Sequence, residues 1–125
     1  MKIQSIDTHT QTPVTMPGAT GARMRMLVGP AEGAAVFHMR HFEVEPGGFT
    51  PHHQHNYEHE ILILKGQGSA QSEQGERTFH AGDVIWVAPN EKHQFRNTGS
   101  VPLEFICLIP APQDCAAPAA CQPPK

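Results

Sequence analysis

Long hydrophobic runs and clustered positive charge are the two features that this sequence lacks most clearly. No apolar stretch in its 125 residues approaches the roughly 20 residues that span a bilayer, and the segment Met1–Asp7 has no signal-peptide core. Its nine Lys and Arg residues are scattered along the chain, and the formal net charge is -3. Without a basic stripe, nucleic acid is not an expected partner. We therefore expect a cytoplasmic protein that binds neither a membrane nor a nucleic acid.

Cysteine is also scarce, with three residues and no C-x-x-C pair. Cys107 lies in the apolar run Leu103–Ile109, where a free thiol usually behaves as a small buried hydrophobe. Cys115 and Cys121 lie in residues 111–125, a Pro/Ala-rich segment without hydrophobic periodicity that we expect to be a flexible tail. A disulfide between them is not expected in a reducing compartment, and the role of these two cysteines stays open.

Short strands and frequent turns dominate what the sequence does contain. No 3.6-residue apolar period lasts long enough for a substantial helix. The expected strands are Arg23–Val28, Ala35–Val44, His59–Lys65, Gly68–Ser72, Glu76–Phe79, Val84–Val87, Gln94–Asn97 and Val101–Ile109. This spacing predicts one all-β domain, a sandwich or barrel, over residues 23–110, with an N-terminal arm at 1–22 and the tail at 111–125.

The most informative residues present are the histidines, of which the chain has nine. His53 and His55 lie two residues apart, so on an extended chain both rings point to the same side, whereas His52 points away. His59 opens an apolar strand, and His93 follows a second one. Scattered histidines are often ordinary surface residues. This cluster instead predicts a metal site, because imidazole is the commonest protein ligand for first-row transition metals.

Two spaced patterns resemble the signatures of the cupin superfamily. The first is Gly47-(x5)-His53-x-His55-(x3)-His59-(x6)-Gly66, and the second is Gly82-(x6)-Pro89-(x3)-His93-(x3)-Asn97, in which the proline comes one residue late. The resemblance implies a double-stranded β-helix, the cupin jelly-roll barrel. It also implies the small single-domain subgroup that holds manganese through four histidines, here His53, His55, His59 and His93.

The third ligand of the first signature is usually Glu, so His59 and Glu60 compete for that role. His59 satisfies both spacings, with three residues between it and His55 and six between it and Gly66, whereas Glu60 leaves only five before Gly66. If His59 points inward, strand alternation sends Glu60 to the opposite face, and both cannot bind from one regular strand. We therefore expect His59 to be the ligand.

Five further residues are expected around the metal. Alternation along the two ligand strands turns Ile61, Ile63 and Phe95 toward it, as walls of a mainly apolar substrate pocket. Arg40, on the preceding strand, is the best candidate to contact a substrate anion. The resemblance implies that the strand carrying Cys107 passes the pocket, which makes this thiol the second candidate for a catalytic role.

One divalent transition metal is the expected cofactor. Four neutral imidazoles add no charge, so the metal keeps its own charge and would acidify bound water or bind an anionic substrate. Four ligands leave positions open on a six-coordinate metal, which is typical of a catalytic site. Imidazole also suits Fe, Ni, Cu or Zn, and Mn follows from the resemblance.

Three classes of function are compatible with such a site. The leading expectation is a metal-dependent oxidoreductase, an oxygenase or peroxide-using enzyme, that acts on a small organic molecule. The alternatives are a metal-dependent isomerase or lyase and a non-catalytic sensor of a small ligand, because one fold can host all three. We also expect a homodimer, since the arm and the strand Arg23–Val28 have little local partner and an unpaired strand edge favours association.

Overall fold

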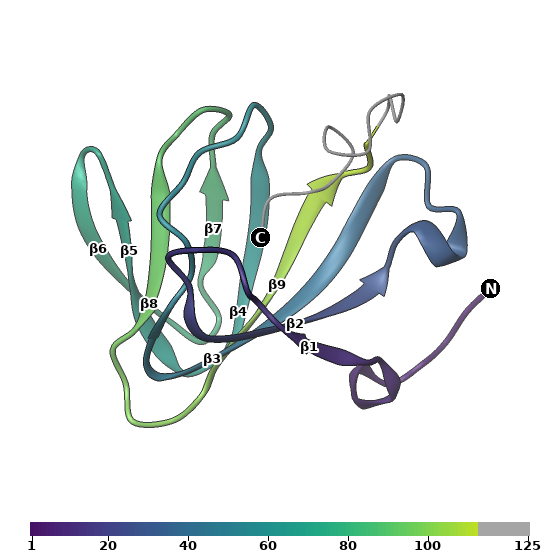
Figure 1. Ribbon diagram of the computed structural model, residues 1–125, viewed down its shortest axis with the longest axis horizontal. Coiled ribbons are helices and arrows are strands. Elements are labelled where there is room, and N and C mark those ends of the chain that lie inside the picture. Colours follow the sequence, from purple (N-terminus) through teal and green to yellow (C-terminus); the bar gives the residue numbers. More distant parts are fainter. Residues whose placement is uncertain (113–125) are drawn as a thin grey trace.

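The computed structural model describes residues 1–112, and this part of the chain is built from strands (Figure 1). They are β1 (Gln11–Pro13), β2 (Thr20–Val28), β3 (Phe37–Phe49), β4 (His59–Lys65), β5 (Gln67–Ser72), β6 (Gly75–His80), β7 (Val84–Val87), β8 (His93–Asn97) and β9 (Leu103–Pro110). Two short 3-10 helices, η1 (Ile6–Thr8) and η2 (Pro30–Glu32), are the only helical elements of the described residues. The predicted all-β class is confirmed. Within the same residues, no helix is long and apolar enough to cross a membrane.

The strands form one antiparallel sheet that curls on itself. Its order is β6-β5-β8-β3-β9-β4-β7, while β2 also pairs with β3 and β1 pairs with β2. Figure 1 shows β5, β6 and β8 turning away from β2, β3 and β9, so that the sheet wraps around an interior. The long strand β3 pairs with β9 along most of its length and meets β8 at its end. It therefore joins the part of the sheet with β5, β6 and β8 to the part with β4, β7 and β9. This is the jelly-roll architecture expected from the sequence.

Alternation along each strand decides which side chains face the interior. In β4, His59, Ile61 and Ile63 are buried, whereas Glu60 and Leu62 are exposed. The inward positions therefore place one histidine and two isoleucines on the same side, and Glu60 on the other, as strand geometry predicts.

Three phenylalanines form the centre of the core. The rings of Phe42 and Phe105 stack with centroids 5.2 Å apart, and Phe95 meets Phe105 edge-on at 5.8 Å. Val44 and Leu103, which are cross-strand partners, are fully buried two residues along the chain from Phe42 and Phe105. Because these side chains come from β3, β8 and β9, the core ties together the strands that carry the site described below.

The third strand is longer than the sequence predicts. The expected strand Ala35–Val44 begins at Phe37 and continues to Phe49, through the stretch Pro46-Gly47-Gly48 that predicts a turn. Gly47 has a φ of +81°, and a Cβ on Gly48 would lie 2.6 Å from the carbonyl oxygen of Thr20 on β2. These two glycines let the strand bend against β2 without ending.

Part of the N-terminal arm joins the sheet. β1 pairs with β2, with Thr12 opposite Met24, and β2 pairs with β3 on its other side from Thr20 to Val28. The sequence-based reason for a homodimer, a strand without a partner in its own chain, is therefore wrong. The boundary at residue 23 stays a prediction. The tail with Cys115 and Cys121 lies, from residue 113 onward, outside the described residues.

Candidate metal centre

Two segments pair through their backbones and so bring distant histidines together. His53 and His93 exchange backbone hydrogen bonds of 3.1 and 2.9 Å, and the Thr50 N–H donates to the Phe95 carbonyl at 2.9 Å. The chain after β3 therefore lies antiparallel to the start of β8. This pairing holds the His53-x-His55 stretch against His93, although about forty residues separate them in sequence.

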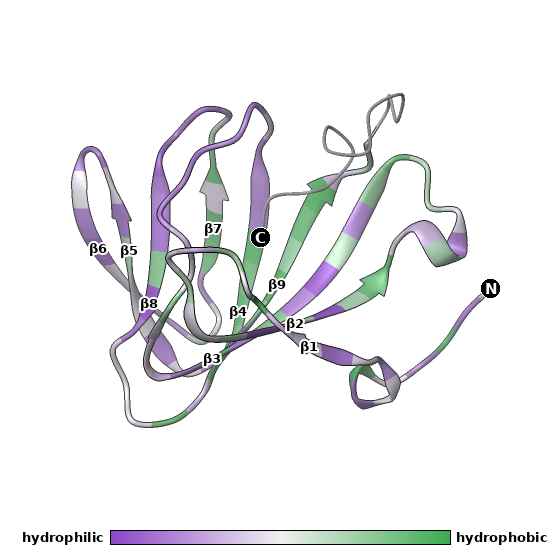
Figure 2. Ribbon diagram, in the orientation of Figure 1, coloured by the Kyte–Doolittle hydropathy of each residue, from purple (hydrophilic) through white to green (hydrophobic). Residues whose placement is uncertain are grey.

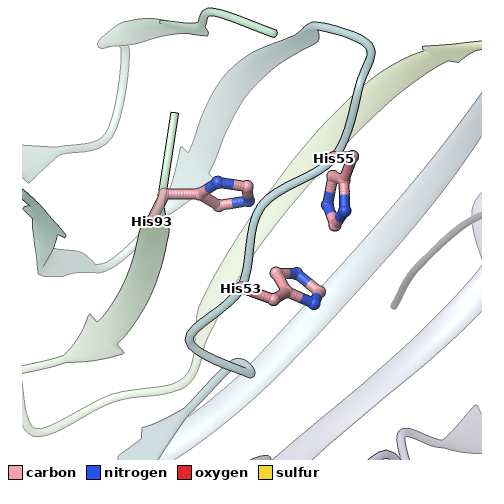
Figure 3. A group of neighbouring side chains, drawn as sticks. All are labelled: His53, His55 and His93. Atoms are coloured by element: carbon pink, nitrogen blue, oxygen red, sulfur yellow. The ribbon is translucent and has the colours of Figure 1, made fainter. Parts of the chain in front are cut away.

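Four imidazole rings face one another in this place. One nitrogen each of His53, His55 and His93 lies within 4.8 Å of the others, and Figure 3 shows the three rings around a common space. His59 stands outside this group of nitrogens, but its ring centroid is 4.8 Å from that of His55 and 5.1 Å from that of His93. The four histidines singled out in the sequence are thus neighbours, three of them more closely than the fourth.

Several ring nitrogens in the centre have no protein partner. Both nitrogens of His55 and Nε2 of His59 are buried and make no hydrogen bond. The Nδ1–H of His93 donates to the Glu91 carbonyl at 2.9 Å, which leaves its Nε2 lone pair available. A buried polar atom without a partner is unfavourable by about 1–3 kcal/mol. A divalent metal would give these nitrogens the missing partner, so the residues present fit such an ion.

A buried guanidinium and a thiol form one wall of the centre. Arg40, 2% exposed, donates to the sulfur of Cys107 at 3.3 Å, and the same sulfur lies 3.2 Å from Nδ1 of His59. Cross-strand pairing places Cys107 between Arg40 on β3 and Ile61 on β4. The two residues proposed from the sequence for a catalytic role therefore contact each other. Cys107 also occupies one nitrogen of His59 and leaves the other to face the centre.

A cavity of about 30 Å³ opens beside these groups. It is lined by Arg40, Phe42, Thr50, His53, His59, Ile61, His93, Phe95, Phe105 and Cys107. Ile61 and Phe95 belong to the lining, whereas Ile63 lies deeper in the core, one alternation step further along β4. Sequence reasoning missed Phe42 and Phe105. Phe42 lies two residues from Arg40 on β3, and Phe105 lies two residues from Cys107 on β9. Strand alternation therefore predicts that each points to the same side as its neighbour.

Tyr57 is a further neighbour that sequence reasoning missed. Its ring stacks on His55 with centroids 5.1 Å apart and planes 20° from parallel. Its hydroxyl is buried without a hydrogen-bond partner, and burial raises the pKa of Tyr57 to about 12. The hydroxyl is therefore a neutral donor at physiological pH. Because Tyr57 lies in a turn between two histidines, no strand periodicity indicates its direction.

Burial keeps the histidines of the centre neutral. It lowers the pKa of His53 to about 4, that of His55 to about 3 and that of His59 to about 2, and the charges of Arg40 and of neighbouring histidines act in the same direction. Burial lowers the pKa of His93 too. Since neutral imidazole is the form that binds metals, no protons need to leave these rings at neutral pH.

Acidification is expected to destabilise the metal-free protein. In the unfolded chain these histidines bind protons once the pH falls below about 6.5, their ordinary pKa. In the folded protein they do so only near their lowered pKa values. The unfolded state therefore holds more protons as the pH falls from about 6.5 to about 4, and the free energy of unfolding decreases by at most about 1.4 kcal/mol per histidine for each pH unit. Thermal unfolding at a series of pH values measures this. A melting temperature that does not change over that range would contradict it.

Comparisons with known proteins agree with this architecture. The profile of the Cupin domain matches residues 40–109, more than half of the chain. The structure is similar to that of the polyketide cyclase RemF from Streptomyces resistomycificus, with a TM-score of 0.83 and 31% identity, covering 88% of this chain and 79% of that one.

Two curated proteins are similar over shorter stretches. The 1-methylthio-D-xylulose 5-phosphate methylsulfurylase of Rhodospirillum rubrum is 33% identical over 76 residues, which are 61% of this chain and 49% of that protein. The oxalate-binding protein of Thermotoga maritima is 35% identical over 68 residues, 54% of this chain and 56% of that protein. The chain thus spans about half the length of these relatives. Their names describe different chemistry, so the likeness alone does not specify a reaction for this chain.

Proposed function

Since this chain belongs to the cupin family, we propose that its histidine centre holds one divalent transition metal and that the protein is an enzyme acting on a small organic molecule. The ligands in this proposal are His53, His55, His59 and His93. The observation that carries it is the convergence of four neutral imidazole rings, several of whose buried nitrogens have no protein partner.

Manganese is our first choice of metal, with Fe, Ni, Cu and Zn as alternatives. A set of four imidazoles does not separate these ions by ligand softness, so the choice of Mn follows from the likeness to four-histidine cupins. Once bound, such an ion would supply a Lewis acid that polarises an oxygen donor of the substrate. Elemental analysis of protein purified from its native source tests the identity of the metal.

The protein's own groups suit a substrate with a negatively polarised oxygen. Arg40 lies in the cavity wall, where a guanidinium can donate charge-assisted hydrogen bonds to an oxyanion. The Tyr57 hydroxyl is a second, neutral donor beside His55. Among residues 1–112, no carboxylate lines this cavity. At about 30 Å³, the cavity holds only one or two water-sized groups, so the reactive end of a substrate enters it and Ile61 and Phe95 contact the apolar part.

Carbonyl chemistry without net oxidation is the reaction class that we favour, as in an isomerase, a lyase or a cyclase. Cys107 lies in the cavity wall and contacts His59. Thiols react readily with oxygen species, so repeated oxidative turnover at this distance would modify the wall of the site. That a protein of similar fold is named a polyketide cyclase supports the same class.

An oxidoreductase, the leading expectation from the sequence, is the second candidate here, and the narrow, apolar lining of the cavity supports it. Phe42, Phe95 and Phe105 line the cavity, and a space of about 30 Å³ admits a diatomic molecule. The name of the oxalate-binding relative supports the third possibility, a protein that binds a small anion without converting it.

Turnover is expected to require the metal and to leave dissolved oxygen unchanged. We would strip the protein with a chelator, reload it with one equivalent of Mn, and follow both a panel of small carbonyl compounds and the oxygen concentration. Only reloaded protein should convert a substrate, with Cys107 still reduced by mass spectrometry. Oxygen uptake in proportion to substrate loss would favour the oxidoreductase. Conversion by folded, fully chelated protein would contradict a metal-dependent enzyme of either kind.

We also propose that the protein works as a homodimer in the cytoplasm. Within its own chain, β2 pairs with β3 along its length and with β1 at residues 23–25, so an unpaired β2 strand is not the support for this proposal.

A further inference from the structure

A tight turn at residues 88–91 joins β7 to β8. The Glu91 N–H donates to the Ala88 carbonyl at 3.2 Å, and the Glu91 carboxylate accepts from the Ala88 N–H at 3.1 Å. Pro89 is the second residue of the turn, and Asn90, the third, has a φ of +66°. Proline followed by a residue with positive φ is the pattern of a type II turn. The proline that comes one residue late in the second signature is thus part of a defined turn.

The backbone of Asn90 has an uncommon conformation. In the described part of the chain, it is the one residue other than glycine with a positive φ. Asparagine tolerates this left-handed conformation better than most residues do, whereas a β-branched residue strongly disfavours it. The Asn90 side chain is exposed, so burial does not hold the residue in place. Such a conformation directs attention to what the backbone itself contacts.

The main chain of this turn contacts two of the four histidines. The Asn90 N–H donates to the His55 carbonyl, and the Glu91 carbonyl accepts from Nδ1 of His93 at 2.9 Å. Within residues 1–112, the contact with His55 is the only hydrogen bond from residues 54–58 to another main-chain group that is also main-chain. Figure 2 shows this stretch and the β7–β8 loop, both at the top, as mainly hydrophilic. Their contact therefore depends on hydrogen bonds more than on apolar packing.

A flip of one peptide would break the contact with His55 and leave the turn closed. Type I and type II turns share the closing hydrogen bond, but ψ of the second residue and φ of the third differ between them by about 150–170°, which turns the peptide between these residues over. Proline fits the second position of both types. A residue at position 90 that avoids positive φ therefore favours the type I form. In that form the N–H of residue 90 points away from the His55 carbonyl.

We propose that Asn90 is a positioning residue of the metal centre, because its left-handed conformation directs the N–H of the turn at His55 and holds this histidine beside His93. The two rings come from separate segments and have centroids 5.2 Å apart. The inference rests on the proposed metal site and adds the element that pre-orients two of its ligands. If the His55 segment moved freely, the apparent affinity for the metal would fall in proportion to the time that the ring spends out of place.

Substitutions at position 90 that differ in their tolerance of positive φ test the proposal. In calorimetric titration of the metal-free full chain with Mn, Asn90→Gly should bind within about twofold of the wild type, because glycine adopts positive φ freely. Asn90→Val should bind about tenfold or more weakly, the usual effect of losing an outer partner of a metal ligand. Asn90→Ala strains the turn less and should fall between them, so it replaces Asn90→Val if that variant does not fold.

Gly33→Val is the matched control. Gly33 has a φ of +69°, lies between β2 and β3, and has open space around an added Cβ. The substitution therefore strains a left-handed position away from the centre. It should lower the melting temperature and leave the affinity for Mn unchanged.

Amide hydrogen exchange in the metal-free protein tests the contact with His55 directly. The amide of residue 90 should exchange about tenfold or more faster in Asn90→Val than in the wild type or Asn90→Gly, while the Glu91 amide, bonded in both turn types, stays protected in all three. Equal affinities in the wild type and Asn90→Val would overturn the proposal, as would an equally large loss in Gly33→Val. If the wild type bound no metal, the proposed function would fail, and the exchange rates alone would show whether the turn holds His55.

Discussion

Replacing His55 by alanine is expected to lower the affinity for the metal by at least about 100-fold, since loss of a ligand exceeds the 10–100-fold effect of losing an outer partner. His55 lies at the centre of the cluster, with ring centroids 4.2 Å from His53, 4.8 Å from His59 and 5.2 Å from His93. Its alanine variant would leave three imidazoles around a gap. Calorimetric titration of metal-free protein with Mn measures the affinity, and elemental analysis measures the occupancy.

His52→Ala is the matched control for this prediction. His52 adjoins His53 in sequence but is exposed, and its variant should bind the metal with unchanged affinity. His59→Ala and Glu60→Ala form a second pair, because the two residues are adjacent and point to opposite faces of β4. We expect loss of metal in the first and full metal content in the second. The reverse result would show that the ligand set is wrong.

Strand alternation explains why so much of this centre can be predicted from sequence. A period of two places His53 and His55 on one side, excludes His52 and separates His59 from Glu60. None of these inferences needs to know which strands are neighbours. The structure agrees with each of them, with His52 and Glu60 exposed and His55 and His59 buried.

Contacts between strands are what the sequence could not supply. That Arg40 and Cys107 touch depends on the register of β3 against β9, which pairs these two residues although 67 positions separate them in sequence. Ile63 illustrates what alternation leaves undetermined. Its direction follows from alternation, but its depth depends on where the cavity ends, so it lies in the core beyond the lining. Tyr57 was not predicted, because residues in a turn have no regular period from which the direction of a side chain can be inferred.

Replacing Arg40 by methionine is expected to reduce kcat/KM by about 100- to 1000-fold, the effect of removing one donor to a developing oxyanion, while the metal content stays unchanged. Methionine keeps an apolar stem of similar length for the contact with Phe42, over whose ring the guanidinium lies at 5.0 Å. Removing one buried charge can also destabilise a fold, so the melting temperature of Arg40→Met is measured beside its activity. A loss of kcat/KM at unchanged melting temperature and metal content assigns the effect to catalysis and anion binding.

Oxalate provides a readout of Arg40 that does not require the natural substrate. Metal-loaded Arg40→Met should bind this dianion at least about tenfold more weakly than the wild type, because a charge-assisted hydrogen bond is lost, and Arg40→Lys should recover part of the affinity. Cys107→Ala separates two roles for the arginine. If Arg40 acts only by holding the thiol against His59, Cys107→Ala should reproduce its effect on oxalate binding. If Arg40 contacts the anion directly, Cys107→Ala should bind oxalate nearly as well as the wild type, and this is the result that we expect from a guanidinium in the cavity wall.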